Sequence, residues 1–174
     1  MIHVKKYILE ATGTMKIFDA SDIFQFAVRI EENGERFYRY AATIVDNEET
    51  KHLFNVLADE ELNHKKYFST LLSKIESYEP PETYPGEYMA YLRNYLDNKV
   101  VFSSHATKDE FGGVKDTLSA LDFAINREVD SILYYSEAKN LVPRSQHAEI
   151  EKIIAEERRH FAKLTDFKRQ YDKK

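Results

Sequence analysis

Residues 57–64 read LADEELNH, and residues 153–160 read IIAEERRH. Each stretch holds a glutamate followed three residues later by a histidine: Glu61 with His64, and Glu157 with His160. Apolar residues at helical spacing continue on both sides, so each glutamate interrupts a stripe expected to face a core. A carboxylate buried alone would cost several kcal/mol or take up a proton, and these glutamates therefore need partners.

Two more glutamates interrupt apolar stripes in the same way. Glu31 lies in one row and Glu128 in another; the rows are Phe24, Ala27, Glu31, Gly34, Tyr38, Ala41 and Val45, and Leu121, Ala124, Glu128, Ile132 and Tyr135. By contrast, Glu32 shares a face with arginines, and Glu156 shares one with Lys152, Arg159 and Lys163. We expect both of these glutamates on the surface.

The two halves of the chain repeat this pattern. Glu31 and Tyr38 recur as Glu128 and Tyr135 at an offset of 97 residues, and the Glu61/His64 pair recurs as Glu157/His160 at an offset of 96. Two helical hairpins related by a pseudo-two-fold axis would bring four carboxylates and two imidazoles together at mid-bundle.

The periodic segments predict helices at about 21–46, 48–76, 116–140 and 146–171, with breaks at Asn47 and around Asn140 and Pro143. The segment 77–115 is rich in proline and glycine and is predicted to be a long crossover. Its middle can form one short helix, with Tyr88, Tyr91 and Tyr95 packed against the bundle. The predicted fold is all-α, a ferritin-like four-helix bundle of two antiparallel pairs. Residues 1–20 are expected to be an N-terminal extension to a bundle domain at 21–174.

Composition excludes several kinds of function. The 174 residues contain no cysteine, which excludes disulfides, thiolate metal sites and a cysteine nucleophile. The net charge of −5 argues against general nucleic-acid binding. No apolar stretch approaches the roughly 20 residues that span a bilayer, and we expect a cytoplasmic protein without membrane partners.

A Glu-x-x-His pattern alone is weak, and the chain contains a control for it. Glu49 and His52 have the same spacing near the start of the second predicted helix. They lie about 120° around that helix from the Glu61/His64 pair, at about 100° per residue. No inward glutamate matches them, so we interpret them as surface residues.

Four carboxylates and two imidazoles favour iron or manganese over zinc or calcium, because they mix hard oxygen donors with borderline nitrogen donors. The same donor set is the general pattern of ferritin-like di-iron and di-manganese proteins. Two divalent cations would balance the four negative charges, whereas the donor set without a cation would leave negative charge buried and unpaired. The alternative is a metal-free core network of ion pairs.

From about Ser21 to Arg169 the chain resembles the rubrerythrin branch of the ferritin-like superfamily, through the stretches AVRIEENGERFY, LADEELNH, FAINREVDSILYY and IAEERRH. The resemblance implies two iron ions, with manganese or a mixed pair as the alternative. It implies that Glu61 and Glu157 bridge the metals, that Glu31 and His64 are terminal ligands to one metal, and that Glu128 and His160 are terminal ligands to the other. It also implies that Tyr38 and Tyr135 hydrogen-bond ligands; their alternative role is core packing.

Two departures from the rubrerythrin pattern bear on function. The family members with a rubredoxin domain pass electrons through a cysteine-ligated iron, which this chain lacks. Those members also have an extra glutamate three residues after the third-helix ligand, where this chain has Ser131. The site is thus expected to be the symmetric six-ligand type.

We therefore expect an oxidoreductase that reacts with peroxide or dioxygen and takes electrons from a separate donor protein. The alternatives are an iron-binding or sequestration protein without redox turnover, and a metal-free helical scaffold. A homodimer is expected rather than a ferritin shell.

Overall fold

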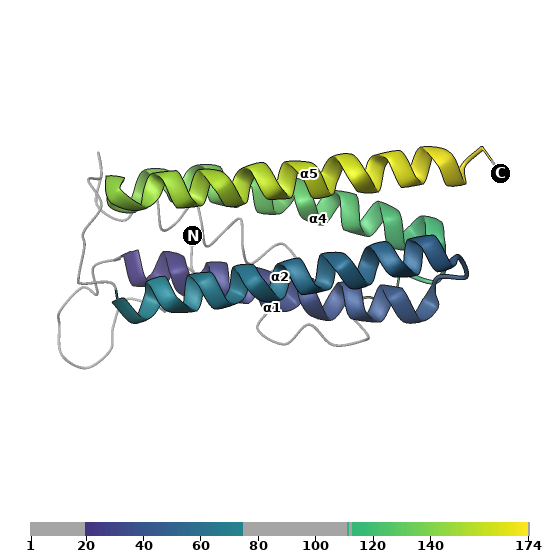
Figure 1. The fold of residues 1–174 in the computed structure, drawn as a ribbon, viewed down its shortest axis with the longest axis horizontal. Helices are drawn as coiled ribbons and strands as arrows, with labels where there is room; N and C mark the ends of the chain where they lie inside the picture. The colour runs from purple at the N-terminus through teal and green to yellow at the C-terminus, as the bar shows by residue number, and fades with distance from the viewer. Residues whose placement is uncertain (1–19, 75–110, 112, 174) are drawn as a thin grey trace, which may run out of the picture.

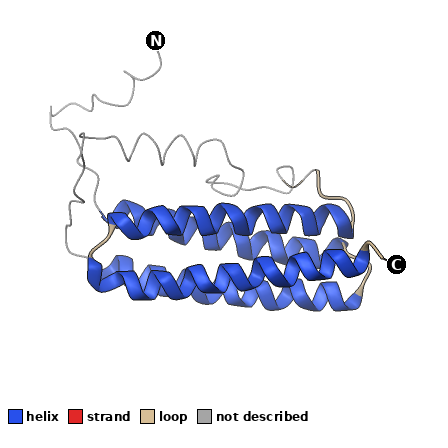
Figure 2. Ribbon diagram, turned by 90° about the horizontal axis from the view of Figure 1, so that it is seen from above, coloured by secondary structure: helices blue, strands red, loops and turns tan. Residues whose placement is uncertain are grey.

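Four long helices lie side by side in the computed structural model, which describes residues 20–74, 111 and 113–173 (Figure 1). The helices are α1 Ala20–Ile44, α2 Glu48–Lys74, α4 Thr117–Ala138 and α5 His147–Tyr171, with two short 3-10 helices, η3 Lys139–Leu141 and η4 Arg144–Gln146. α1 packs along α2, and α4 packs along α5. The described residues contain no strand (Figure 2), which confirms the predicted all-α bundle.

The first hairpin turns at the predicted break. α1 ends at Ile44, two residues before the predicted end, and α2 begins directly after Asn47. The Asn47 side-chain oxygen accepts hydrogen bonds from the backbone N–H groups of Glu49 at 2.8 Å and Thr50 at 3.1 Å. Asparagine is suited to this position because it satisfies N–H groups that the first helical turn leaves without partners.

The second hairpin begins at a capping box and is tied to the first. Asp116 accepts a hydrogen bond from the backbone N–H of Ser119 at 2.8 Å, and the Ser119 hydroxyl accepts one from the backbone N–H of Asp116 at 3.1 Å. The Thr117 hydroxyl donates to Asp46 at 2.8 Å. Because Asp46 lies in the α1–α2 turn, this bond connects the two hairpins at one end of the bundle.

The apolar core consists of two clusters, and every long helix contributes to both. One cluster contains Ile23, Phe24, Ala27, Ile30, Phe68, Tyr134, Tyr135, Ala138, Leu141, Val142, Ile150, Ile153 and Ile154. The other contains Phe37, Tyr38, Ala41, Ala42, Leu53, Phe54, Leu57, Ala58, Phe111, Val114, Ala120, Leu121, Ala124 and Leu164. Along each helix, the inward glutamates and histidines fall between the two clusters. The bundle therefore holds a polar layer closed at both ends by apolar side chains.

Some predictions fall outside the described residues. These are the N-terminal extension, most of the crossover, and its short helix with Tyr88, Tyr91 and Tyr95. The end of the crossover is described at Phe111, whose buried ring lies 5.4 Å from that of Phe37. Within the described ranges, no helix is long and apolar enough to cross a membrane.

Candidate metal centre

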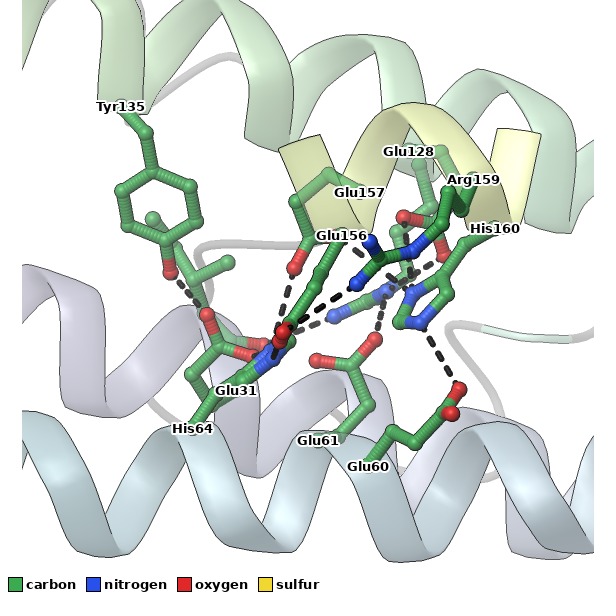
Figure 3. Close-up of polar contacts among 12 residues, drawn as sticks. Glu31, Glu60, Glu61, His64, Glu128, Tyr135, Glu156, Glu157, Arg159 and His160 are labelled. Carbon is green, nitrogen blue, oxygen red and sulfur yellow. Dashed lines mark hydrogen bonds and ion pairs between the residues drawn. The ribbon is translucent and has the colours of Figure 1, made fainter. Parts of the chain in front are cut away.

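Each long helix contributes one glutamate to the polar layer, and α2 and α5 also contribute a histidine (Figure 3). The four glutamates are completely buried, and the histidines are 6% and 2% exposed; the set is Glu31, Glu61, His64, Glu128, Glu157 and His160. The structure thus brings together all six residues that the sequence singled out. Ligation itself stays a prediction.

The six residues form two overlapping groups, in each of which one donor atom per residue lies within 4.8 Å of the others. The groups are Glu31, Glu61, His64 and Glu157, and Glu61, Glu128, Glu157 and His160. Glu61 and Glu157 belong to both groups. Two neighbouring donor groups that share two carboxylates could hold two metal ions side by side. Below, the first group is called position 1 and the second position 2.

Many buried polar atoms of this layer have no hydrogen bond, and their nearest polar neighbours belong to the layer itself. Each of the six residues has at least one buried side-chain oxygen or nitrogen without a hydrogen bond: Glu31 Oε2, Glu61 Oε2, His64 Nδ1, Glu128 Oε2, both oxygens of Glu157, and His160 Nδ1. Buried polar atoms without partners are rare because each costs about 1–3 kcal/mol. Divalent cations would satisfy these atoms, so the residues fit a metal pair.

Both histidines are held from outside the layer by a glutamate of the opposite hairpin. His64 Nε2 lies 2.6 Å from Glu156 Oε2, and His160 Nε2 lies 2.8 Å from Glu60 Oε2. These contacts leave the two Nδ1 atoms facing the carboxylates, with His64 Nδ1 3.1 Å from Glu157 Oε1. A carboxylate behind a metal-binding histidine orients the ring and raises its basicity.

Glu156 corrects one prediction from the sequence. Its side chain is 40% exposed and pairs with Arg159 at 3.2 Å, as a surface glutamate would, yet its other oxygen holds His64. Glu60 is its counterpart in the repeat, directly before Glu61 as Glu156 is directly before Glu157. The repeat of two adjacent glutamates, Glu60-Glu61 and Glu156-Glu157, could have indicated from the sequence that Glu60 and Glu156 have matching roles. The hydrogen bond from His160 lowers the pKa of Glu60 below its ordinary value.

Tyr38 and Tyr135 each donate a hydrogen bond to a glutamate of the other hairpin. The Tyr38 hydroxyl of α1 donates to Glu128 of α4, and the Tyr135 hydroxyl of α4 donates to Glu31 of α1. Each tyrosine thus bonds to one oxygen of Glu31 or Glu128, and the other oxygen of each carboxylate has no hydrogen bond. Burial, together with the nearby carboxylate, raises the pKa of both hydroxyls, which keeps them protonated as donors.

Arg127 is the residue of the layer that the sequence analysis missed. It is 1% exposed, and its Nη1 lies 2.8 Å from Glu61 Oε1 and 3.2 Å from Glu128 Oε1. A single buried arginine changes the charge balance inferred from the sequence, because four carboxylates and one guanidinium sum to −3 rather than −4. The sequence contained one indication of this residue. In the repeat, Arg127 directly precedes Glu128, whereas the apolar residue Ile30 directly precedes Glu31.

Without metal, three of the four carboxyl groups of the layer have raised pKa values. Burial and the neighbouring charge of Glu61 raise the pKa of Glu31 to about 8, and burial also raises the pKa of Glu128 and Glu157. Burial would raise the pKa of Glu61 as well, but the Arg127 guanidinium and other contacts lower it to about 2. Burial would lower the pKa of His64, but its contacts with Glu157 and Glu31 raise it.

Two further predictions from the sequence concern the surface pair Glu49 and His52, and Ser131. Glu49 and His52 are exposed at the start of α2, as predicted. Ser131 is 1% exposed, and its hydroxyl oxygen is buried without a hydrogen bond.

Comparison with known proteins agrees with this geometry. The family model described as Rubrerythrin matches residues 22–168. A crystal structure from Thermotoga maritima at 2.30 Å, described as a putative ferritin-like diiron-carboxylate protein, is similar with a TM-score of 0.60 and 30% sequence identity. That match covers 89% of this chain and 97% of the Thermotoga chain. No curated protein matched the sequence.

The stability of the metal-free protein should fall as the pH rises from about 5 to 9. Glu31 has a folded-state pKa of about 8 against an ordinary value of 4.5, so its contribution is present below 4.5 and lost as the pH rises through 8. His64, with its raised pKa, acts in the same direction. Thermal midpoints measured with a chelator would test this. The Glu31→Gln variant should show a shallower decline, and a midpoint that rises over this range would contradict the assignment.

Replacing Gly34 by alanine should destabilise the protein although alanine favours helices by about 1 kcal/mol. A Cβ at Gly34 would lie 1.8 Å from Arg127 Nη2 and 2.3 Å from its Cζ. The matched control is Gly113→Ala, because a Cβ there meets nothing within 4 Å. We expect a lower urea midpoint for the first variant only. Equal midpoints for both variants would show that the guanidinium does not occupy this place.

The Glu156→Gln variant should bind metal about 10- to 100-fold more weakly, because it weakens the hold on His64 Nε2. Glu151→Gln is the control, since Glu151 lies on the same helix and pairs with Lys139 at 2.7 Å on the surface. Equilibrium titration with Co²⁺ would measure both. If Glu156→Gln binds as tightly as Glu151→Gln, the contact with His64 has no role in metal binding.

Proposed function

This chain belongs to the rubrerythrin family and has the fold of a ferritin-like di-iron protein, and we propose that it is a non-haem di-iron oxidoreductase that reacts with hydrogen peroxide or dioxygen. The observation that carries the proposal is the pair of overlapping donor groups, in which buried atoms of six residues have no hydrogen-bond partner. A helical scaffold that worked without metal would gain nothing from this arrangement, because unpaired buried charge is destabilising.

In this proposal Glu61 and Glu157 would help to hold both ions, since they alone belong to both donor groups. Glu31 and His64 complete position 1, and Glu128 and His160 complete position 2. A bound iron pair would supply the two electrons that, with two protons, reduce hydrogen peroxide to water, and the donor protein would return the iron to the ferrous state. The apolar clusters on either side of the layer exclude water and so strengthen each electrostatic interaction within it.

The side chains around the layer have separate roles. Tyr38 and Tyr135 fix the terminal glutamates from the opposite hairpin. Glu156 and Glu60 fix the histidines and reach the surface, with side chains 40% and 39% exposed. They are therefore the groups through which a proton can pass between solvent and the Nε2 atoms.

The reducing electrons would come from a separate donor protein. These 174 residues contain no cysteine, so they hold no thiolate-bound iron centre that could relay electrons. The reaction of a reduced site with oxidant can therefore be tested in a single turnover, without identifying the donor.

The test is anaerobic loading with Fe²⁺, followed by hydrogen peroxide or air-saturated buffer in separate arms. We expect about two iron ions per chain and oxidation much faster than that of free Fe²⁺ in the same buffer. The Glu61→Ala variant should lose most of the loading, because Glu61 belongs to both positions. Glu49→Ala, on the exposed face of α2, is the matched control.

Two outcomes would decide against oxidoreductase function. Normal loading with oxidation no faster than in buffer, for both oxidants, would favour the alternative of iron binding without redox turnover. Absence of metal after purification and after loading would favour the metal-free scaffold.

A further inference from the structure

The two halves of the polar layer differ at one charged residue. In the repeat, Arg127 directly before Glu128 corresponds to Ile30 directly before Glu31, at the same offset of 97 residues. Both side chains are buried, at 1% and 0% exposure. One half of the layer therefore carries a full positive charge where the other carries a hydrocarbon.

The guanidinium contacts the layer on the side of position 2. Arg127 Nη1 lies 2.8 Å from Glu61 Oε1 and 3.2 Å from Glu128 Oε1, and Nη2 donates to the backbone oxygen of Ile30 at 3.3 Å. Glu128 belongs to position 2 alone, and Glu61 to both positions. Glu31 and Glu128 each accept a hydrogen bond from a tyrosine and lie near a histidine Nδ1, but of the two only Glu128 also contacts the guanidinium.

The guanidinium is seated in a slot on α1 that fits it. A Cβ at Gly34 would lie 1.8 Å from Arg127 Nη2, and the ring of Tyr38 lies 5.2 Å from Arg127 Cζ. Glycine in the middle of a helix is unfavourable, so its presence here is explained by the space that the guanidinium needs. α1 thus leaves room for the guanidinium at Gly34 and places the Tyr38 ring beside it.

We propose that Arg127 makes the two metal positions unequal, so that position 1 fills first and position 2 binds its metal about tenfold or more weakly. The oxygens Glu61 Oε2 and Glu128 Oε2 stay without a hydrogen bond, but the guanidinium contacts the other oxygen of each carboxylate. Its positive charge repels a cation in position 2, and this repulsion is stronger in a buried site than in water. The inference rests on the proposed metal binding, and it concerns the order of filling rather than the reaction.

The test is a titration of the metal-free protein with Co²⁺ under anaerobic conditions, followed by visible absorption and calorimetry. The wild-type protein should bind two ions per chain in two resolved steps. In the Arg127→Met variant, which keeps an unbranched side chain and removes the charge, the second step should tighten until the two steps differ by less than about threefold. Arg127→Lys should retain two resolved steps.

Two further variants assign the steps to positions. Glu31→Gln should remove the tight step and leave the weak one, and Glu128→Gln should remove the weak step and leave the tight one. These variants keep the residues at 34 and 127, so they test the order of filling even if Arg127→Met folds poorly, which far-UV circular dichroism would show.

The outcomes separate this inference from the proposed function. Two equal steps in the wild-type protein, or the same ratio of affinities in wild type and Arg127→Met, would overturn the inference and leave the metal site intact. Loss of the tight step in Glu128→Gln would also overturn it. No binding of Co²⁺ at all would overturn the proposed function, and the inference with it.

Discussion

Four carboxylates share one layer of the bundle between two apolar clusters, and the arrangement of the layer follows from the need to give each of them a partner. Bringing them together without compensation would be prohibitive in a medium that screens charge poorly. Three kinds of side chain supply the compensation. Tyrosine hydroxyls bond to the terminal glutamates, imidazoles face the carboxylates, and one guanidinium pairs with Glu61 and Glu128. The oxygens that remain without a bond are those that a metal pair would use.

These partnerships also join the two hairpins. The tyrosine of each hairpin bonds to a glutamate of the other, and each histidine is held by a glutamate of the other. The hairpins must therefore dock in one register for the layer to be satisfied. The bond from Thr117 to Asp46 supports the same register at the end of the bundle. Polar contacts of this kind specify an arrangement that apolar packing alone would leave open.

Much of this structure was predictable from local pattern. The 3.6-residue period located the helices, and a glutamate that interrupts an apolar stripe is visible in one helix at a time, so Glu31, Glu61, Glu128 and Glu157 could be named before their partners were known. The internal repeat then predicted that they would meet. Asn47 and Pro143 marked the breaks because their backbone preferences act locally, while helix ends shifted by up to two residues.

The residues that escaped prediction have roles that depend on another helix. Arg127 resembles a surface arginine in its own stretch of sequence, and its burial becomes intelligible only with Gly34 of α1 facing it. Glu156 likewise stands among basic residues on its own helix, and its contact with His64 depends on how α2 lies beside α5. Periodicity reports which face a residue occupies, but it does not report which residue of a distant helix lies opposite.

The fit between Gly34 and Arg127 also makes these two positions depend on each other. A Cβ at position 34 would lie 1.8 Å from Arg127 Nη2, so a larger residue there would force the guanidinium to move. That movement would disturb its contacts with Glu61 and Glu128 at 2.8 Å and 3.2 Å. Substitutions at 34 and 127 are therefore expected to be non-additive, each changing the effect of the other.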